Sequence, residues 1–401
     1  MALRYHYSVP RYLAGRVGSW LRPRHFFSRL TPLRLEEVPF RPPSPRWVIL
    51  KSRLCGICGS DLNLLKGAES YLLEPYASFP CILGHEVVAE VAEAPPETGF
   101  RPGERVAVNP LLPCRARELP PCPSCREGRE NLCENFTRGN LAPGPLLGFH
   151  RQAGGGMAEY LAAPPESLVR LPDGLPDEAA VLVDSLASAL QPVLDHFPAD
   201  SDIVVIYGAG IIGQQLLRAL RALGSQARVV MVARHPFQSE LARAGGADLV
   251  LLSPSRRELG EAVGARYLPT TLGGGNLEGG AHRFFDCVGS RASLQEGLVA
   301  LRARGTYVLV GTAGRVGPVD FSALWFRELR LCGSAMYGHG IFQGQPRRTY
   351  ELAVELLSRP SYSRAGLLTH TFPLRDYVPA FQAAFDKRRH HSVKVALDPR
   401  Q

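Results

Sequence analysis

Two different hydrophobic patterns divide the chain near residue 190. Before it, short runs alternate apolar and polar side chains between glycines and prolines, at 47–52, 87–91 and 105–108. Such runs predict the short strands of a compact β-rich domain. Beyond it, continuous apolar strands alternate with helical patterns, at 203–206, 211–223, 228–232, 238–244, 284–288 and 307–310. This alternation predicts a doubly wound α/β domain with a parallel sheet.

The two ends of the chain carry patterns of their own. Residues 350–357 and 378–385 have helical periodicity, and 392–397 read as a last strand. Near the start, Tyr5, Tyr7 and Val9 alternate as in a first strand, and 33–39 continue into a second. Residues 1–35 also hold seven arginines and no acidic residue, a feature of mitochondrial transit peptides. The strand pattern favours a first strand of the domain instead.

Composition narrows the class of protein. The 401 residues, 45% of them hydrophobic, exceed what one core usually holds, so we expect two domains. No run approaches the roughly 18 apolar residues of a membrane helix. The net charge of +9 comes mostly from arginines spread along the chain without a nucleic-acid reading motif, so we expect no nucleic-acid partner. Nine cysteines cannot all pair, and their spacing favours metal binding in a reducing cytoplasm.

A glycine-rich turn follows the first apolar strand of the second half and opens its first helix. It consists of Gly208, Ala209, Gly210, Ile211, Ile212 and Gly213. In this context the glycines permit a tight turn, close approach of a pyrophosphate and close helix packing, while the helix N-terminus attracts phosphate. The turn predicts a dinucleotide site; an ordinary glycine-rich βα turn is the alternative.

Four cysteines form a second motif, with seven, two and seven residues between them. They are Cys114, Cys122, Cys125 and Cys133. Four thiolates suit a tetrahedral structural Zn²⁺. An iron–sulfur centre and unligated buried cysteines are the alternatives.

A third motif combines Cys58, Ser60 and Asp61 with His85 and Glu86. Cysteine and histidine are good zinc ligands and Glu86 is a candidate third ligand, which leaves room for a substrate. A histidine satisfied within the core is the structural alternative for His85.

Together these motifs, in this order, resemble those of the zinc-dependent medium-chain alcohol dehydrogenases, in the branch that acts on polyols, sugars and threonine. The resemblance covers almost the whole chain. It implies a GroES-like catalytic domain at 1–190, completed by 336–401, and a Rossmann domain at 191–335.

The resemblance also assigns residues of the catalytic centre. It makes Cys58 and His85 catalytic zinc ligands and Glu86 the neighbouring carboxylate. Asp61 would orient the ligand histidine, as carboxylates near metal sites do. Ser60 would receive the hydroxyl proton of the substrate. Cys55 and Cys81 are not expected to bind metal.

Two positions depart from the family pattern. Asp184 stands where typical alcohol dehydrogenases have a third cysteine ligand and the polyol branch has glutamate, which favours polyhydroxylated or amino-alcohol substrates. Aspartate is shorter, so it would reach zinc directly or through water; a helix N-cap is the alternative role. Asn63 replaces a histidine that passes the substrate proton to solvent, and an amide cannot titrate.

The end of the second α/β strand informs the choice of nicotinamide cofactor. NAD-specific enzymes carry a carboxylate there, which repels the 2′-phosphate of NADP. Here Ala233 stands at that position, followed by Arg234 and His235. Because a guanidinium suits phosphate, we expect NADP(H) rather than NAD(H). The resemblance further implies Ser188 near the nicotinamide and Lys394 at the pyrophosphate.

The sequence therefore predicts an enzyme with one catalytic and one structural zinc that moves a hydride between a small alcohol and the nicotinamide. The family resemblance implies a homodimer or homotetramer. Three alternatives stay open: a zinc-free quinone or enoyl reductase, a non-catalytic nucleotide-binding protein of the same fold, and a metal-binding interaction protein without turnover.

Overall fold

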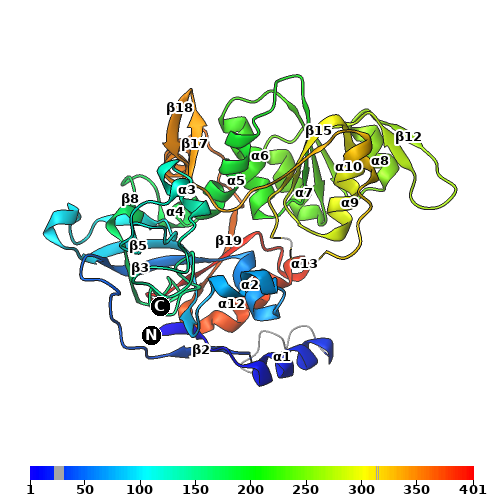
Figure 1. The fold of residues 1–401 in the computed structure, drawn as a ribbon. Coiled ribbons are helices and arrows are strands. Elements are labelled where there is room, and N and C mark those ends of the chain that lie inside the picture. The colour runs from blue at the N-terminus through cyan, green and yellow to red at the C-terminus, as the bar shows by residue number, and fades with distance from the viewer. Residues whose placement is uncertain (22–30, 313, 315) are drawn as a thin grey trace.

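The structure, a computed structural model, describes the chain except for residues 22–30, 313 and 315. Figure 1 shows two lobes, one built from the first strands together with the C-terminal segment and the other from the middle of the chain. In the described part, no helix is long and apolar enough to span a membrane.

The N-terminal residues form part of a small sheet. Strand β1 (Ala2–Tyr5) pairs with β2 (Leu33–Glu36) and with β4 (Cys81–Ile82), both antiparallel. The expectation that the first strand extends to Val9 is wrong, because Val9 begins helix α1 (Val9–Leu21). Pro10 fits the first turn of this helix, where no backbone N–H is needed.

The lobe that holds the expected catalytic residues, called the catalytic lobe for that reason, is built on one mixed sheet. Its order is β19 (Leu368–Pro373), β20 (Lys394–Asp398), β3 (Val48–Ile57), β5 (Glu86–Glu93), β6 (Arg105–Val108) and β8 (Leu168–Arg170), with β7 (Tyr160–Ala163) also on β3. The alternating patterns at 47–52, 87–91 and 105–108 thus lie in strands. Strand β20 pairs antiparallel with β3, so the C-terminal strand belongs to this sheet.

The second lobe is a parallel six-stranded sheet. Its order is β11 (Leu249–Leu252), β10 (Arg228–Ala233), β9 (Ile203–Tyr207), β14 (Ala281–Asp286), β15 (Leu301–Leu309) and β16 (Arg330–Gly333). The strand order reverses between β9 and β14, where open α/β sheets bind ligands beyond the carboxyl ends of the strands. The predicted doubly wound domain is confirmed.

Helices cover both sheets and join the lobes. Helix α5 (Val183–Asp195) packs on α6 (Ile211–Ala222) and α11 (Thr349–Ser358), and one apolar cluster runs through all three. The other helices are α2 (Gly59–Lys66), α3 (Pro123–Arg126), α4 (Asp177–Ala180), α7 (Pro236–Ala244), α8 (Arg256–Ala262), α9 (Arg291–Ala300), α10 (Ser322–Phe326), α12 (Tyr377–Phe385) and α13 (Lys387–His390).

Short hairpins and 3₁₀ turns complete the architecture. The hairpins pair β12 (Arg266–Leu268) with β13 (Asn276–Glu278), and β17 (His339–Phe342) with β18 (Gln345–Arg348). The 3₁₀ helices span Tyr71–Tyr76, Pro96–Thr98, Glu130–Leu132, Pro165–Ser167 and Leu374–Asp376.

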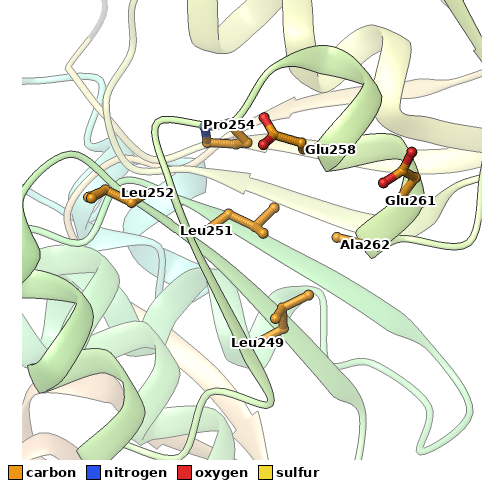
Figure 2. A pocket seen from close by; sticks show the side chains of 7 residues that line it. All are labelled: Leu249, Leu251, Leu252, Pro254, Glu258, Glu261 and Ala262. Atoms are coloured by element: carbon orange, nitrogen blue, oxygen red, sulfur yellow. The ribbon is translucent and has the colours of Figure 1, made fainter.

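A pocket lies at one edge of the parallel sheet (Figure 2). Leucines of β11 line it on one side, and Glu258, Glu261 and Ala262 of α8 line it on the other. None of the predicted site residues lines this pocket, so it is separate from the site described below.

Candidate active site

The predicted catalytic ligands come together between two adjacent strands. Cys58 directly follows β3 and precedes α2, while His85 directly precedes β5 and Glu86 is its first residue. The donor atoms of Cys58, His85 and Glu86 all lie within 4.8 Å of one another. Gly56, which pairs with Glu86 across the two strands, has no room for a side chain, because a Cβ there would overlap the Glu86 carboxylate.

Asp61 orients this cluster from inside α2. Its Oδ2 accepts a hydrogen bond from the backbone N–H of Cys58 at 2.9 Å, and its Oδ1 lies 3.9 Å from His85 Nδ1. His85 Nε2 faces the other way, 3.5 Å from the Ser60 hydroxyl. The imidazole therefore presents one nitrogen to Asp61 and the other to the ligand cluster, which is the arrangement predicted for a metal-binding histidine.

The electrostatics of this cluster favour a cation. Burial lowers the pKa of His85, but the negative charges of Cys58, Asp61 and Asp184 outweigh it and raise that pKa to about 10. Both His85 Nδ1 and Asp61 Oδ1 are buried without a hydrogen-bond partner. The same surrounding charges would stabilise a divalent ion, and thiolate and imidazole are donors that zinc prefers. The donor set fits zinc.

Glu86 is engaged by a lysine that we expected elsewhere. Lys394 Nζ lies 2.6 Å and 2.5 Å from the two carboxylate oxygens of Glu86, and it also donates to the Ile57 carbonyl. Both side chains are 2% exposed. The expectation that Lys394 binds the cofactor pyrophosphate is thus wrong, because its ammonium is buried against Glu86. Glu86 could reach a metal only by sharing its oxygens with this lysine.

Asp184 lies beside the cluster and is held by a tyrosine. The Tyr337 hydroxyl donates to Asp184 Oδ2 at 2.5 Å, and the Tyr337 ring packs on Tyr350. Burial raises the pKa of Asp184 to about 6. The N-cap alternative is wrong, because α5 is capped by Leu182 and Asp184 lies inside its first turn. Ser188, half-buried, follows one turn later on α5.

The four-cysteine motif forms a compact cluster of its own. The sulfur atoms of Cys114, Cys122, Cys125 and Cys133 lie within 4.8 Å of one another. Three of these sulfurs accept N–H groups: Cys122 from Glu134, Cys133 from Asn135, and Cys114 from Cys122 and the Asn135 amide. No disulfide joins any of the nine cysteines. Four clustered sulfurs with N–H donors suit a tetrahedral zinc ion.

A buried arginine supports the segment that carries these cysteines. Arg117 is fully buried and has no carboxylate partner; burial lowers its pKa to about 10. Its guanidinium donates instead to the carbonyls of Leu112, Arg138, Leu141, Ala142 and Gly144. The planar fork of one side chain therefore fixes a loop that has little secondary structure.

The glycine-rich turn has the geometry expected of a dinucleotide site. Gly208 has a φ of +108°, which only glycine adopts readily. A Cβ on Gly213 would overlap the Gly208 carbonyl, whereas a Cβ on Gly210 would meet only the Lys387 ammonium within 4 Å. Ile211 and Ile212 begin α6 at this point.

A lysine that no local pattern predicted also lies at this turn. Lys387 Nζ, from α13 in the catalytic lobe, lies 3.8 Å from the place a Cβ on Gly210 would occupy. In the sequence, Lys387 is the first of five consecutive basic residues at 387–391, and such a run is typical of a solvent-exposed helix.

The end of β10 lies next to the same C-terminal segment. Ala233 is buried as the last residue of β10, Arg234 is exposed, and His235 is half-buried. The Phe237 ring stacks on His235 at 5.7 Å between centroids and on His391 at 5.1 Å. Asn63 bridges the lobes at another point, donating to the Thr312 hydroxyl at 3.2 Å.

Comparison with known proteins agrees with this geometry. The model of the alcohol dehydrogenase GroES-like domain matches residues 44–173, and the zinc-binding dehydrogenase model matches 211–359. An L-threonine 3-dehydrogenase of Chelativorans is 28% identical over 373 residues, covering 91% of this chain and 95% of the relative. Human sorbitol dehydrogenase is 28% identical over 374 residues, covering 92% and 93%.

A solved structure shares the whole architecture. It is a zinc-binding dehydrogenase from Sinorhizobium meliloti bound to NADP, 26% identical, with a TM-score of 0.71 over 92% of this chain and 95% of that one. Both family models, the curated relatives and the shared fold lead to one conclusion: the chain belongs to the zinc-binding alcohol dehydrogenase family, in its polyol- and threonine-dehydrogenase-like branch.

Proposed function

We propose that this oxidoreductase uses zinc and NADP(H) to interconvert a polyhydroxylated, sugar or amino alcohol and its carbonyl. The observation that carries the proposal is the cluster of Cys58, His85 and Glu86, with the carboxylate of Asp184 beside it. Cys58 and His85 would hold the catalytic ion, with Glu86 or Asp184 completing the set directly or through water.

Each residue around the proposed substrate site has a separate role. Zinc, when bound, supplies Lewis-acid polarisation of the alcohol oxygen. Asp61 holds His85 in orientation, and Ser60, 3.5 Å from His85, is placed to accept the hydroxyl proton. Asn63 cannot transfer this proton to solvent, because its amide does not titrate and donates a hydrogen bond to the Thr312 hydroxyl. We propose Ser188, one turn after Asp184 on α5, as a contact of the nicotinamide.

The substrate class follows from the carboxylate at position 184. A buried carboxylate in place of a cysteine adds an acceptor near the site, and acceptors suit neighbouring hydroxyl or ammonium groups of a substrate. The relatives named for sorbitol and L-threonine act on alcohols of these two kinds.

The proposed cofactor preference depends on the end of β10. The buried Ala233 carries no carboxylate to repel a 2′-phosphate, and the exposed Arg234 and half-buried His235 add donors. The structural relative from Sinorhizobium meliloti binds NADP. Arg234→Ala should lower kcat/KM for NADP by roughly ten- to a hundredfold and leave NAD almost unchanged. A native preference for NAD that this substitution does not alter would refute the NADP proposal.

The remaining parts of the proposal concern the assembly. The four-cysteine cluster would bind a second, structural zinc, and a reducing cytoplasm would keep all nine thiols free. We propose a catalytic domain of 1–190 and 336–401, a Rossmann domain of 191–335, and a homodimer or homotetramer.

The deciding experiment combines metal analysis with a substrate panel. Freshly purified protein should contain two zinc ions per chain and should oxidise members of a panel of polyols, sugars and amino alcohols with NADP. Removal of the catalytic ion by a chelator should abolish turnover, and added zinc should restore it. Turnover of quinones or enoyl substrates that survives chelation would support the zinc-free reductase instead, and two zincs without any turnover would support a binding protein.

A further inference from the structure

Helix α13 lies where the two lobes meet (Figure 1). Its first residue reaches the dinucleotide turn, because Lys387 Nζ stands 3.8 Å from the Cβ position of Gly210, the residue that caps the N-terminus of α6. The N-terminal end of α6 carries partial positive charge from its free backbone N–H groups. Two positive groups thus face each other across the place where a dinucleotide site holds phosphate.

Lys387 forms no close pair with an anion. Within the described part of the chain, no hydrogen bond or ion pair involves its ammonium. Burial and the ammoniums of Lys394 and Lys66 lower its pKa, and the Cys58 thiolate opposes them only in part. The chain has only four lysines among 46 basic residues, and three of them gather here. A half-buried, unpaired cation among other cations is costly unless an anion joins it.

A second group of bases surrounds the end of β10 from both lobes. His235 lies in the electrostatic field of Arg234 from its own strand end and of Arg388, Lys387 and His391 from the C-terminal segment. The stack of Phe237 between His235 and His391 fixes the two segments against each other. In the proposed enzyme, the adenosine ribose of the cofactor would lie at this end of β10.

We propose that α13 and the residue after it supply cofactor-phosphate contacts from the catalytic lobe. Lys387 binds the pyrophosphate that NAD(H) and NADP(H) share. Arg388 and His391 join Arg234 and His235 around the 2′-phosphate, which only NADP(H) has. The cofactor therefore bridges the two lobes at both phosphate groups. This inference rests on the proposed function for the identity of the cofactor.

Calorimetric titration of the zinc-loaded protein tests both contacts without turnover. ADP serves as the probe for the pyrophosphate contact and adenosine 2′-monophosphate as the probe for the 2′-phosphate contact, beside NADH and NADPH. Lys387→Gln should weaken ADP, NADH and NADPH by about tenfold each and leave adenosine 2′-monophosphate unchanged. Arg388→Gln should weaken NADPH and adenosine 2′-monophosphate by about tenfold and leave ADP and NADH unchanged.

Arg389→Gln is the matched control, because Arg389 is an exposed base on the same short helix. It should change none of the four affinities, and zinc content and melting temperature establish that each variant folds. If Lys387→Gln does not fold, Lys387→Met replaces it with an uncharged stem of similar length. Unchanged ADP affinity on loss of the Lys387 charge overturns the pyrophosphate contact. Equal effects of Arg388→Gln on NADH and NADPH, or none, overturn the 2′-phosphate contact.

The outcomes separate this inference from the proposed function. If no alcohol is oxidised but ADP binding depends on Lys387, the enzymatic proposal fails and the pyrophosphate contact stands. If the enzyme turns over and Lys387→Gln binds all four ligands normally, the enzymatic proposal stands and the pyrophosphate contact fails.

Discussion

Replacing Lys394 by methionine should destabilise the catalytic lobe strongly. The ammonium lies 2.6 Å and 2.5 Å from the two oxygens of Glu86, and both side chains are 2% exposed. Methionine fills a similar volume but leaves the Glu86 carboxylate buried without its counter-ion. Breaking a buried ion pair on one side costs about 3–5 kcal/mol, because the remaining charge has lost its compensation.

A double-mutant cycle tests whether the uncompensated charge of Glu86 causes this loss of stability. Glu86→Gln in the Lys394→Met background removes the uncompensated charge, so the double variant should regain stability by about 2 kcal/mol or more. Lys51→Met is the matched control, since Lys51 is an exposed lysine on the neighbouring β3, and its replacement should shift stability by less than about 0.5 kcal/mol.

Denaturant unfolding followed by tryptophan fluorescence is a suitable assay. Trp47 is 5% exposed in the core of the catalytic lobe, so its emission changes when this lobe unfolds. Zinc content is measured for every variant, because Glu86 belongs to the proposed catalytic zinc site. A loss below about 1 kcal/mol for Lys394→Met, or a double variant no more stable than the single one, would refute the role of the buried pair.

Three further expectations follow from other parts of the structure. Cys125→Ser should remove one zinc equivalent and lower the melting temperature, while any folded protein keeps its catalytic zinc; full stability with both zincs retained would contradict a structural site. Arg117→Met should cost about 3–5 kcal/mol, because several buried carbonyls lose their donor, and denaturant unfolding against an Arg115→Met control measures it. Burial lowers the pKa of His150 to about 4, from 6.5. The neutral ring donates a hydrogen bond from Nε2 to the Ala142 carbonyl and accepts one at Nδ1 from the Ala153 N–H. The free energy of unfolding should therefore fall by about 3 kcal/mol as the pH drops from 6.5 to 4, and His150→Asn should flatten this part of the profile; a variant with the native slope would exclude His150 as the cause.

Local signals predicted much of the fold. The strands at 203–206 and 228–232 and the helix after the glycine-rich turn follow from patterns a few residues long, and the structure places them at Ile203–Tyr207, Arg228–Ala233 and Ile211–Ala222. The clustering of the four cysteines follows equally from their spacing. These features depend on neighbours in the sequence, which a pattern records directly.

The errors and omissions have a different origin. The role of Lys394 depends on the pairing of β20 with β3, which brings it to a glutamate 308 residues earlier in the chain. Lys387 reads as one base in a solvated run, and only packing of the two lobes brings it to Gly210. These two positions depend on contacts between distant segments, for which local periodicity has no signal. The N-cap interpretation of Asp184 fails for a local reason, because α5 begins at Val183 and a sequence pattern places a helix end only to within one or two residues.

The position of β20 has a consequence for synthesis on the ribosome. This strand lies between β19 and β3, so the sheet beside Cys58 and His85 acquires these two strands only when residues 368–398 emerge. The parallel sheet, complete at Gly333, needs none of them. Although domains usually fold in the order of their translation, here the domain that is started first is finished last. A nascent chain arrested before residue 394 would display a complete parallel sheet beside a second sheet whose β3 edge is unpaired, and such an edge is a template for pairing with another chain.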